Sequence, residues 1–120
     1  MSKKTLVIGA SEKPDRYSNM AIRRLRAAGH PVVALGLKEG SVEDVDIHTG
    51  YPQFTDIHTV TLYVSPQHQS SLFDYIGSIH PQRVIFNPGT ENESLIEQLR
   101  LAGMEVNEAC TLVMLSTGQY

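Results

Sequence analysis

The chain has 120 residues, of which 41% are hydrophobic and 19% charged, and its formal net charge is −3. This composition is typical of a globular domain with its own core, and we expect residues 1–120 to form one domain. The charge gives no basic footprint for nucleic acid, and no apolar run approaches the roughly 18 residues that span a membrane. Cys110 is the single cysteine, which excludes a disulfide framework and a cysteine metal cluster and favours a reducing, cytoplasmic location.

The first strand, loop and helix are expected in the segment LVIGASEKPDRYSN, residues 6–19. Thr5–Ile8 is a short apolar run bounded by Gly9, which predicts a strand buried on both faces. Ser18 is a candidate cap for a helix that continues to about Ala28.

The middle of the chain is expected to contain two more strands. Val32–Leu35 is the second apolar run, and Thr59–Val64 is a third, rich in β-branched residues. Residues 38–58 are interpreted as mostly loop, with a short strand near Val45–His48.

The second half of the chain repeats the strand–helix alternation. Ser65 and Pro66 predict a helix start, and Pro81 predicts its end. Thr90 and Glu93 have the spacing of a capping box, with Thr90 as the cap. The remaining strands and the last short helix are expected at Arg83–Phe86, Met104–Val106 and Cys110–Leu115.

This alternation predicts an α/β fold, Rossmann-like and doubly wound, with a five-stranded parallel sheet and helices on both faces. In such a sheet, ligands bind beyond the carboxyl ends of the strands. The segments expected at that edge are Gly9–Ser11, Gly36–Lys38, Val64–Pro66, Asn87–Gly89 and Asn107–Glu108.

The loop after the first strand is a candidate phosphate site. Gly9 allows a tight turn, and the following helix presents N–H groups and a dipole that favour an anion. Arg16 adds a cation, and Ser18 or Asn19 adds a polar donor. The alternative is an ordinary strand–loop–helix turn in which Gly9 serves geometry alone.

Neither common nucleotide fingerprint is complete. The frame G-x-G-x-x-G has only its first glycine here, and the P-loop pattern is absent. Lys38 follows the second strand, where an NAD protein carries an acid for the ribose diol. A lysine there suits a ribose phosphate better than a free diol.

The segments VIGAS, RYSN and NPGTENESL…LAGMEV resemble the small stand-alone CoA-binding domain proteins. That family shares its fold with the nucleotide-binding domain of the succinyl-CoA synthetase alpha subunit, and the resemblance covers nearly the whole chain. The family commonly has Asn-Pro after its second strand, where this chain has Gly36 and Leu37. The contacts on the adenine side are therefore not carried over.

The resemblance implies a set of cofactor-binding residues for CoA or acyl-CoA. The first loop would line the pyrophosphate, the helix start would flank it, and the residue after the second strand would meet the adenosine phosphate. The segments after the third and fourth strands would lie against the nucleotide and close the pocket. In chain order these residues are Gly9, Ala10, Ser11, Arg16, Tyr17, Ser18, Lys38, Val64, Ser65, Pro66, Asn87, Pro88 and Gly89.

The sequence favours a non-catalytic CoA or acyl-CoA binding module that acts as a sensor or as the partner of a larger enzyme. The phosphohistidine of the synthetases lies in a second domain outside this resemblance, so we expect no catalytic residue, and the sequence indicates no metal site. The expected partner is a small-molecule nucleotide, without nucleic acid or membrane, and a protein partner stays open. The alternatives are a small NAD(P)-binding oxidoreductase and a structural subunit that has lost its ligand.

Overall fold

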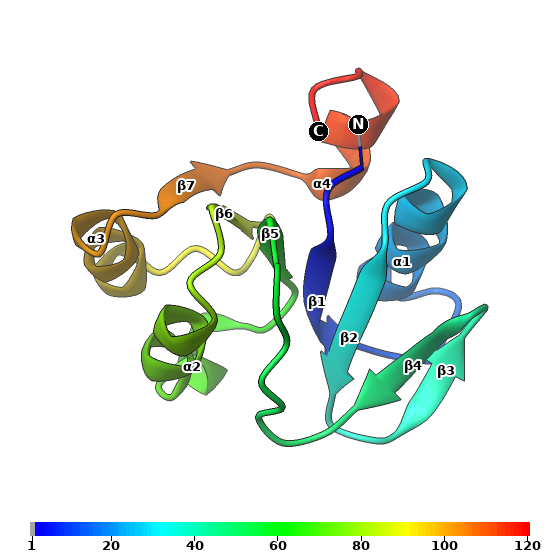
Figure 1. The fold of residues 1–120 in the computed structure, drawn as a ribbon, viewed down its shortest axis with the longest axis horizontal. Coiled ribbons are helices and arrows are strands. Elements are labelled where there is room, and N and C mark those ends of the chain that lie inside the picture. The colour runs from blue at the N-terminus through cyan, green and yellow to red at the C-terminus, as the bar shows by residue number, and fades with distance from the viewer. Residues whose placement is uncertain (1) are drawn as a thin grey trace.

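A seven-stranded sheet organises the protein in its computed structural model, which describes residues 2–120. The strand order is β3-β4-β2-β1-β5-β6-β7, and helices pack on both sides (Figure 1). The strands are β1 Thr5–Ala10, β2 Val32–Gly36, β3 Gly40–Val42, β4 Val45–His48, β5 Thr59–Leu62, β6 Arg83–Phe86 and β7 Glu105–Glu108. The helices are α1 Tyr17–Ala27, α2 Leu72–Ile79, α3 Glu93–Leu101 and α4 Thr111–Ser116, with a 3₁₀ helix, η1, at Pro66–His68.

The predicted α/β class and the helices on both faces are confirmed, but the strand count was wrong. The sheet is mixed rather than five-stranded and parallel, because a hairpin of β3 and β4 extends it beyond β2. β4 pairs parallel with β2, and β3 pairs antiparallel with β4. The expected short strand at Val45–His48 is confirmed as β4.

The hairpin was missed because its turn has no Asn-Gly or Asp-Gly signal. Glu43 stands at the turn with φ 53°, a conformation that glycine or asparagine adopts more readily. Arg26 holds the neighbouring Asp44 through two hydrogen bonds, of 3.0 and 2.7 Å. A contact between α1 and the turn thus supports a backbone conformation that local sequence does not favour.

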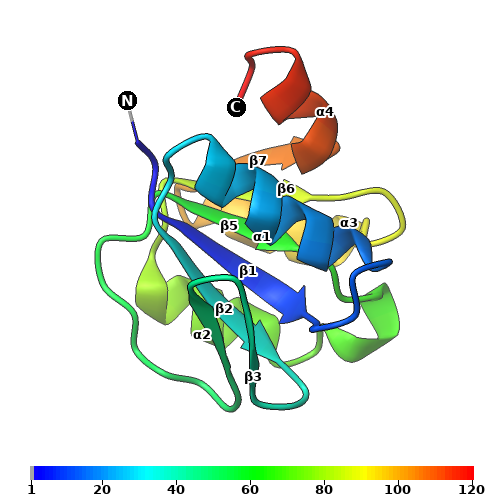
Figure 2. The same cartoon turned by 90° about the vertical axis from the view of Figure 1, so that its right-hand side faces the viewer.

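Alternate residues of the strands pack into two separate hydrophobic cores, one on each face of the sheet. Leu6 and Ile8 of β1 face α2 and α3, whereas Val7 faces α1 and α4. Figure 2 shows α1 lying across one face of the sheet and α2 behind the other. The two-sided burial explains why β1, β5 and β6 are almost uniformly apolar or β-branched.

Three expected helix starts differ from those observed. α1 begins at Tyr17, so Ser18 lies inside the helix rather than at its cap. Asn92, not Thr90, caps α3 and accepts a bond from Leu95 N–H at 3.2 Å. Ser65 precedes the 3₁₀ helix η1, and α2 begins only at Leu72. The local patterns contained several polar residues that could cap, and the tertiary packing selected among them.

Candidate functional site

The parallel strands bring the predicted site segments to one edge of the sheet. β1 pairs with β2 and β5, and β5 pairs with β6, all in parallel, so their carboxyl ends face the same way. At the opposite edge, where β1 begins, Lys3 Nζ donates to the main-chain oxygen of Tyr120 at the C-terminus (Figure 1). Gly9–Ser11, Gly36–Lys38 and the segments after β5 and β6 therefore share the carboxyl edge.

Two glycines at this edge are required by the sheet itself. Gly9 has φ 96°, and a Cβ on it would lie 2.7 Å from the main-chain oxygen of Tyr63. A Cβ on Gly36 would lie 2.5 Å from the main-chain oxygen of Ala10. Both glycines thus permit neighbouring strand ends to approach each other, so their presence is explained without a ligand.

The start of α1 leaves its backbone donors open. The N-cap residue Arg16 makes no side-chain capping bond, and the first turn contains no acidic residue. The first bond of the helix runs from Met20 N–H to Arg16 O at 3.1 Å. Within residues 2–120, the N–H groups of Tyr17, Ser18 and Asn19 meet no acceptor. Such a helix start, with an exposed arginine beside it, is suited to an anion.

The loop between β1 and α1 is held in shape by its own polar contacts. Asn19 Nδ2 donates to Ser11 O at 2.9 Å, and Lys13 N–H donates to Ser11 Oγ at 3.1 Å. Glu12 reaches the hairpin, where Oε2 accepts from Ser41 N–H at 2.9 Å. The loop is therefore fixed on both sides, and a preformed loop loses less conformational freedom on binding an anion.

Asn87, one of the predicted pocket residues, is committed to the interior. Its Nδ2 donates to Thr61 Oγ1 at 2.7 Å and to Leu62 O at 2.8 Å, and its Oδ1 accepts from Thr111 N–H at 2.9 Å. The side chain is 2% exposed. Asn87 therefore fixes the ends of β5 and β6 against α4.

The other predicted residues differ in how their side chains meet solvent. Ala10 and Ser18 are buried, so a ligand would reach them through the backbone. Tyr17 is 69% exposed, and Leu37, beside the predicted Lys38, is fully exposed. Five of the remaining predicted residues are exposed and four are half-buried. The exposed residues are Arg16, Lys38, Pro66, Pro88 and Gly89, and the half-buried ones are Gly9, Ser11, Val64 and Ser65.

Two residues at this edge were missed by the sequence analysis. Tyr63 follows β5, and burial raises the pKa of its phenol to about 12. Gln69 is almost wholly buried, and its Nε2 donates to Val64 O and Thr90 O. Nothing in the polar stretch that contains Gln69 indicated burial, because its partners are main-chain oxygens, and one of them, Thr90 O, is 21 residues away in sequence.

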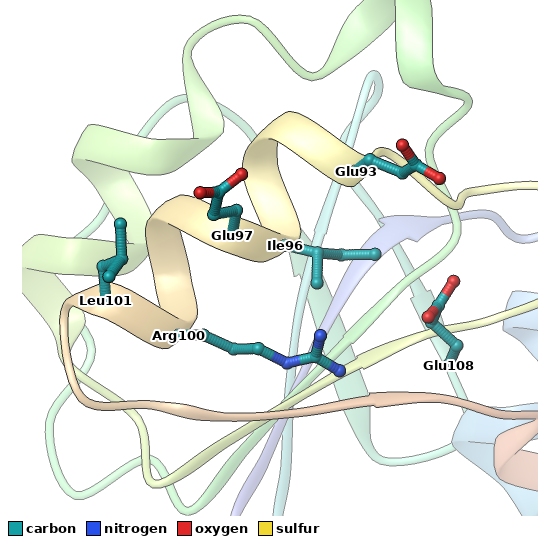
Figure 3. Close-up of a pocket in the computed structure, with 6 residues that line it drawn as sticks. All are labelled: Glu93, Ile96, Glu97, Arg100, Leu101 and Glu108. Atoms are coloured by element: carbon teal, nitrogen blue, oxygen red, sulfur yellow. The ribbon is translucent and has the colours of Figure 1, made fainter.

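A pocket of about 510 Å³ lies elsewhere, between α3 and the edge strand β7. Figure 3 shows the side chains of Glu93, Glu108 and Arg100 around this space. Arg100 also donates to Val106 O at 3.3 Å. The pocket contains none of the predicted site residues, and its glutamates would repel phosphate groups. Its lining residues are Glu93, Ile96, Glu97, Arg100, Leu101 and Glu108.

Residues 2–120 contain no group of three or more histidine, cysteine, aspartate or glutamate side chains arranged to hold a metal ion. None of the helices in this part of the chain is long and apolar enough to cross a membrane.

The fold and its carboxyl edge define a Rossmann-like α/β protein. Residues 3–116 match the family model described as CoA binding domain, and the chain belongs to that family. The resemblance inferred from the sequence motifs is therefore confirmed.

Solved structures have the same fold. A protein described only as uncharacterized is 47% identical, with a TM-score of 0.97 and coverage of 100% of this chain and 99% of the other. "Prb (PH1109 protein redesigned for binding)" is 21% identical, with a TM-score of 0.87 and coverage of 98% and 84%. A hypothetical protein from Pyrococcus horikoshii OT3 is 24% identical, with a TM-score of 0.84 and coverage of 97% and 83%. The last two show the fold alone. A search of curated proteins found no match.

Proposed function

We propose that this protein binds CoA or a short acyl-CoA at the carboxyl edge of its sheet and does not itself transform the ligand. The observation that carries the proposal is the open start of α1 in a chain of the CoA-binding family. Three unpaired N–H groups and Arg16 supply the donors and charge that a pyrophosphate requires.

Different residues at this edge would contact different parts of the nucleotide. The backbone of Gly9, Ala10 and Ser11 would approach the pyrophosphate, next to Arg16 and Tyr17 at the helix start. Lys38 is exposed after β2 and would meet the ribose phosphate. The walls would come from Val64, Ser65 and Pro66 on one side and Pro88 and Gly89 on the other, with Ser18 contributing its N–H and Asn87 holding the strand ends.

A binding role without catalysis suits the chemistry of this edge. The phenol of Tyr63, the residue after β5, packs against the core that contains Ile22 and Leu25, and burial raises its pKa to about 12, so the group stays protonated at neutral pH. It is therefore a poor general base. We infer a cytoplasmic sensor of CoA or a subunit that presents CoA to a partner enzyme.

Calorimetry with CoA, dephospho-CoA and NAD tests the proposal. We expect CoA to bind most tightly, because it alone offers both a pyrophosphate and a ribose phosphate. Tighter binding of NAD would favour the oxidoreductase alternative, and no binding of any of the three would favour a subunit without a ligand.

The variant Lys38→Ala locates the ribose phosphate. A charge-assisted contact is worth about 1.5–3 kcal/mol, and screening at an exposed site reduces it. We expect CoA to bind roughly tenfold more weakly, with dephospho-CoA unaffected. Equal losses for the two ligands would show that Lys38 does not meet that phosphate.

A further inference from the structure

Gln69 joins the two loops that leave β5 and β6. It follows η1, and only 2% of its side chain is exposed. Its Nε2 donates to Val64 O and to Thr90 O, each at 2.8 Å. A single carboxamide thus holds main-chain oxygens that are 26 residues apart in sequence on two sides of the candidate site.

Each loop is already closed by its own short-range bonds. His68 N–H donates to Ser65 O at 2.9 Å in the first loop, and Thr90 N–H donates to Asn87 O at 3.0 Å in the second. The pairing of β5 with β6 ends at Leu62 and Phe86. Beyond that point Gln69 continues the connection between the two segments.

The oxygen of the Gln69 carboxamide bears on how its two Nε2 hydrogen bonds are interpreted. Gln69 Oε1 is buried and has no hydrogen-bond partner within residues 2–120. The reversed amide would place Oε1 against both main-chain oxygens, so the observed orientation is the favourable one. A buried acceptor without a partner costs stability. The two bonds from Nε2 therefore account for a glutamine at this position.

We propose that Gln69 is a positioning residue that holds the loops after β5 and β6 together as one preformed wall of the CoA site. This inference rests on the proposed function. Val64–Pro66 and Pro88–Gly89 form the two halves of that wall, and Gln69 sets their separation without contacting the ligand. A preformed wall improves affinity, because the loops lose less freedom on binding.

Three variants test the role of the carboxamide. Q69E keeps the shape but replaces the donor with an acceptor, and Q69M keeps the length but removes both donors. Q67E is the matched control, because Gln67 is an exposed residue of the 3₁₀ helix that Gln69 follows. CoA affinity is measured by calorimetry well below each variant's melting temperature.

We expect Q69E and Q69M to weaken CoA binding at least about tenfold at pH 7.5, and Q67E to change it less than twofold. Burial raises the pKa of the carboxyl that Q69E introduces, and its protonated form can donate one bond. Relative to the wild type at the same pH, Q69E should therefore regain affinity near pH 5, whereas Q69M should not. Lower melting temperatures with unchanged affinity would show a merely structural role and overturn the inference.

Amide hydrogen exchange without ligand separates this inference from the proposed function. We expect Q69E and Q69M to accelerate exchange at both His68 and Thr90, and Q67E to leave both unchanged. If the wild type does not bind CoA, the proposed function fails, but these amides still report whether Gln69 joins the loops. Faster exchange confined to His68 would refute the connection.

Discussion

The loops that lead into α1 and α3 leave the same edge of the sheet, but their helix starts differ in chemistry. α3 is capped by Asn92 and carries Glu93 in its first turn, while Glu91 accepts from Gly89 N–H at 2.8 Å. α1 has neither a side-chain cap nor a first-turn acid. One helix start is thus satisfied by the protein, whereas the other keeps N–H groups that meet no acceptor within residues 2–120.

This difference explains why similar strand–loop–helix units need not share a function. An anion near α3 would compete with Asn92 and be repelled by Glu91 and Glu93. An anion near α1 would meet open donors and the exposed Arg16. A glycine with positive φ also precedes each helix, Gly9 near the end of β1 and Gly89 in the loop before α3. The glycines alone therefore do not identify the binding loop.

The largest expected effect is a difference in the free energy of unfolding between alanine variants of these two glycines. Gly89→Ala meets nothing within 4 Å, so only the unfavourable φ of 93° costs free energy, about 1–2 kcal/mol. Gly9→Ala adds a 2.7 Å approach to the Tyr63 main chain, and overpacking raises the loss to about 2–5 kcal/mol. Denaturant unfolding measures both. Equal losses would show that β1 can move away from Tyr63.

In a second pair of variants, one should lower the stability of the protein and the other its affinity for CoA. Asn92→Ala removes the cap of α3 and should lower the free energy of unfolding by about 0.5–2 kcal/mol, with CoA binding unchanged. Arg16→Ala should leave stability within about 0.5 kcal/mol but weaken CoA roughly tenfold, as expected for loss of one charge-assisted bond.

Unfolding and calorimetry on both proteins check this crossed pattern. If Arg16→Ala lowered stability and left CoA affinity intact, the start of α1 would be a structural feature rather than a binding site.

The smallest expected effect comes from a substitution that gives α1 a first-turn acid, as α3 has. Tyr17 is the first residue of α1, as Glu93 is of α3, and its side chain is largely exposed. Tyr17→Glu places a carboxylate beside the open N–H groups and should stabilise the protein by about 0.3–1 kcal/mol at low salt. The same charge should weaken CoA binding. Glu93→Gln should destabilise by a similar amount without affecting CoA.

Thermal unfolding at two salt concentrations and calorimetry measure both changes. Stronger CoA binding by Tyr17→Glu would contradict an anion site at this helix start.

The sequence by itself determined the alternation of strands and helices and the edge of the sheet at which the predicted site segments meet. β1, β2, β5 and β6 are short apolar runs, and burial on both faces of a parallel sheet requires such runs. The motifs also identified the CoA-binding family, which the match over residues 3–116 confirms. These features depend on composition and order along the chain, which a sequence records directly.

Only the tertiary structure decided which polar groups remain available at that edge. Asn87 is a polar residue of the predicted site, but its side-chain amide forms hydrogen bonds with Thr61, Leu62 and Thr111. Gln69 has no sequence signal, yet it connects two loops through main-chain oxygens. The turn of the β3–β4 hairpin is likewise supported by the contact with Arg26. In each case at least one hydrogen-bond partner is distant in the chain. A polar side chain bonds to the group that the folded structure brings close to it, and the sequence does not show which group that is.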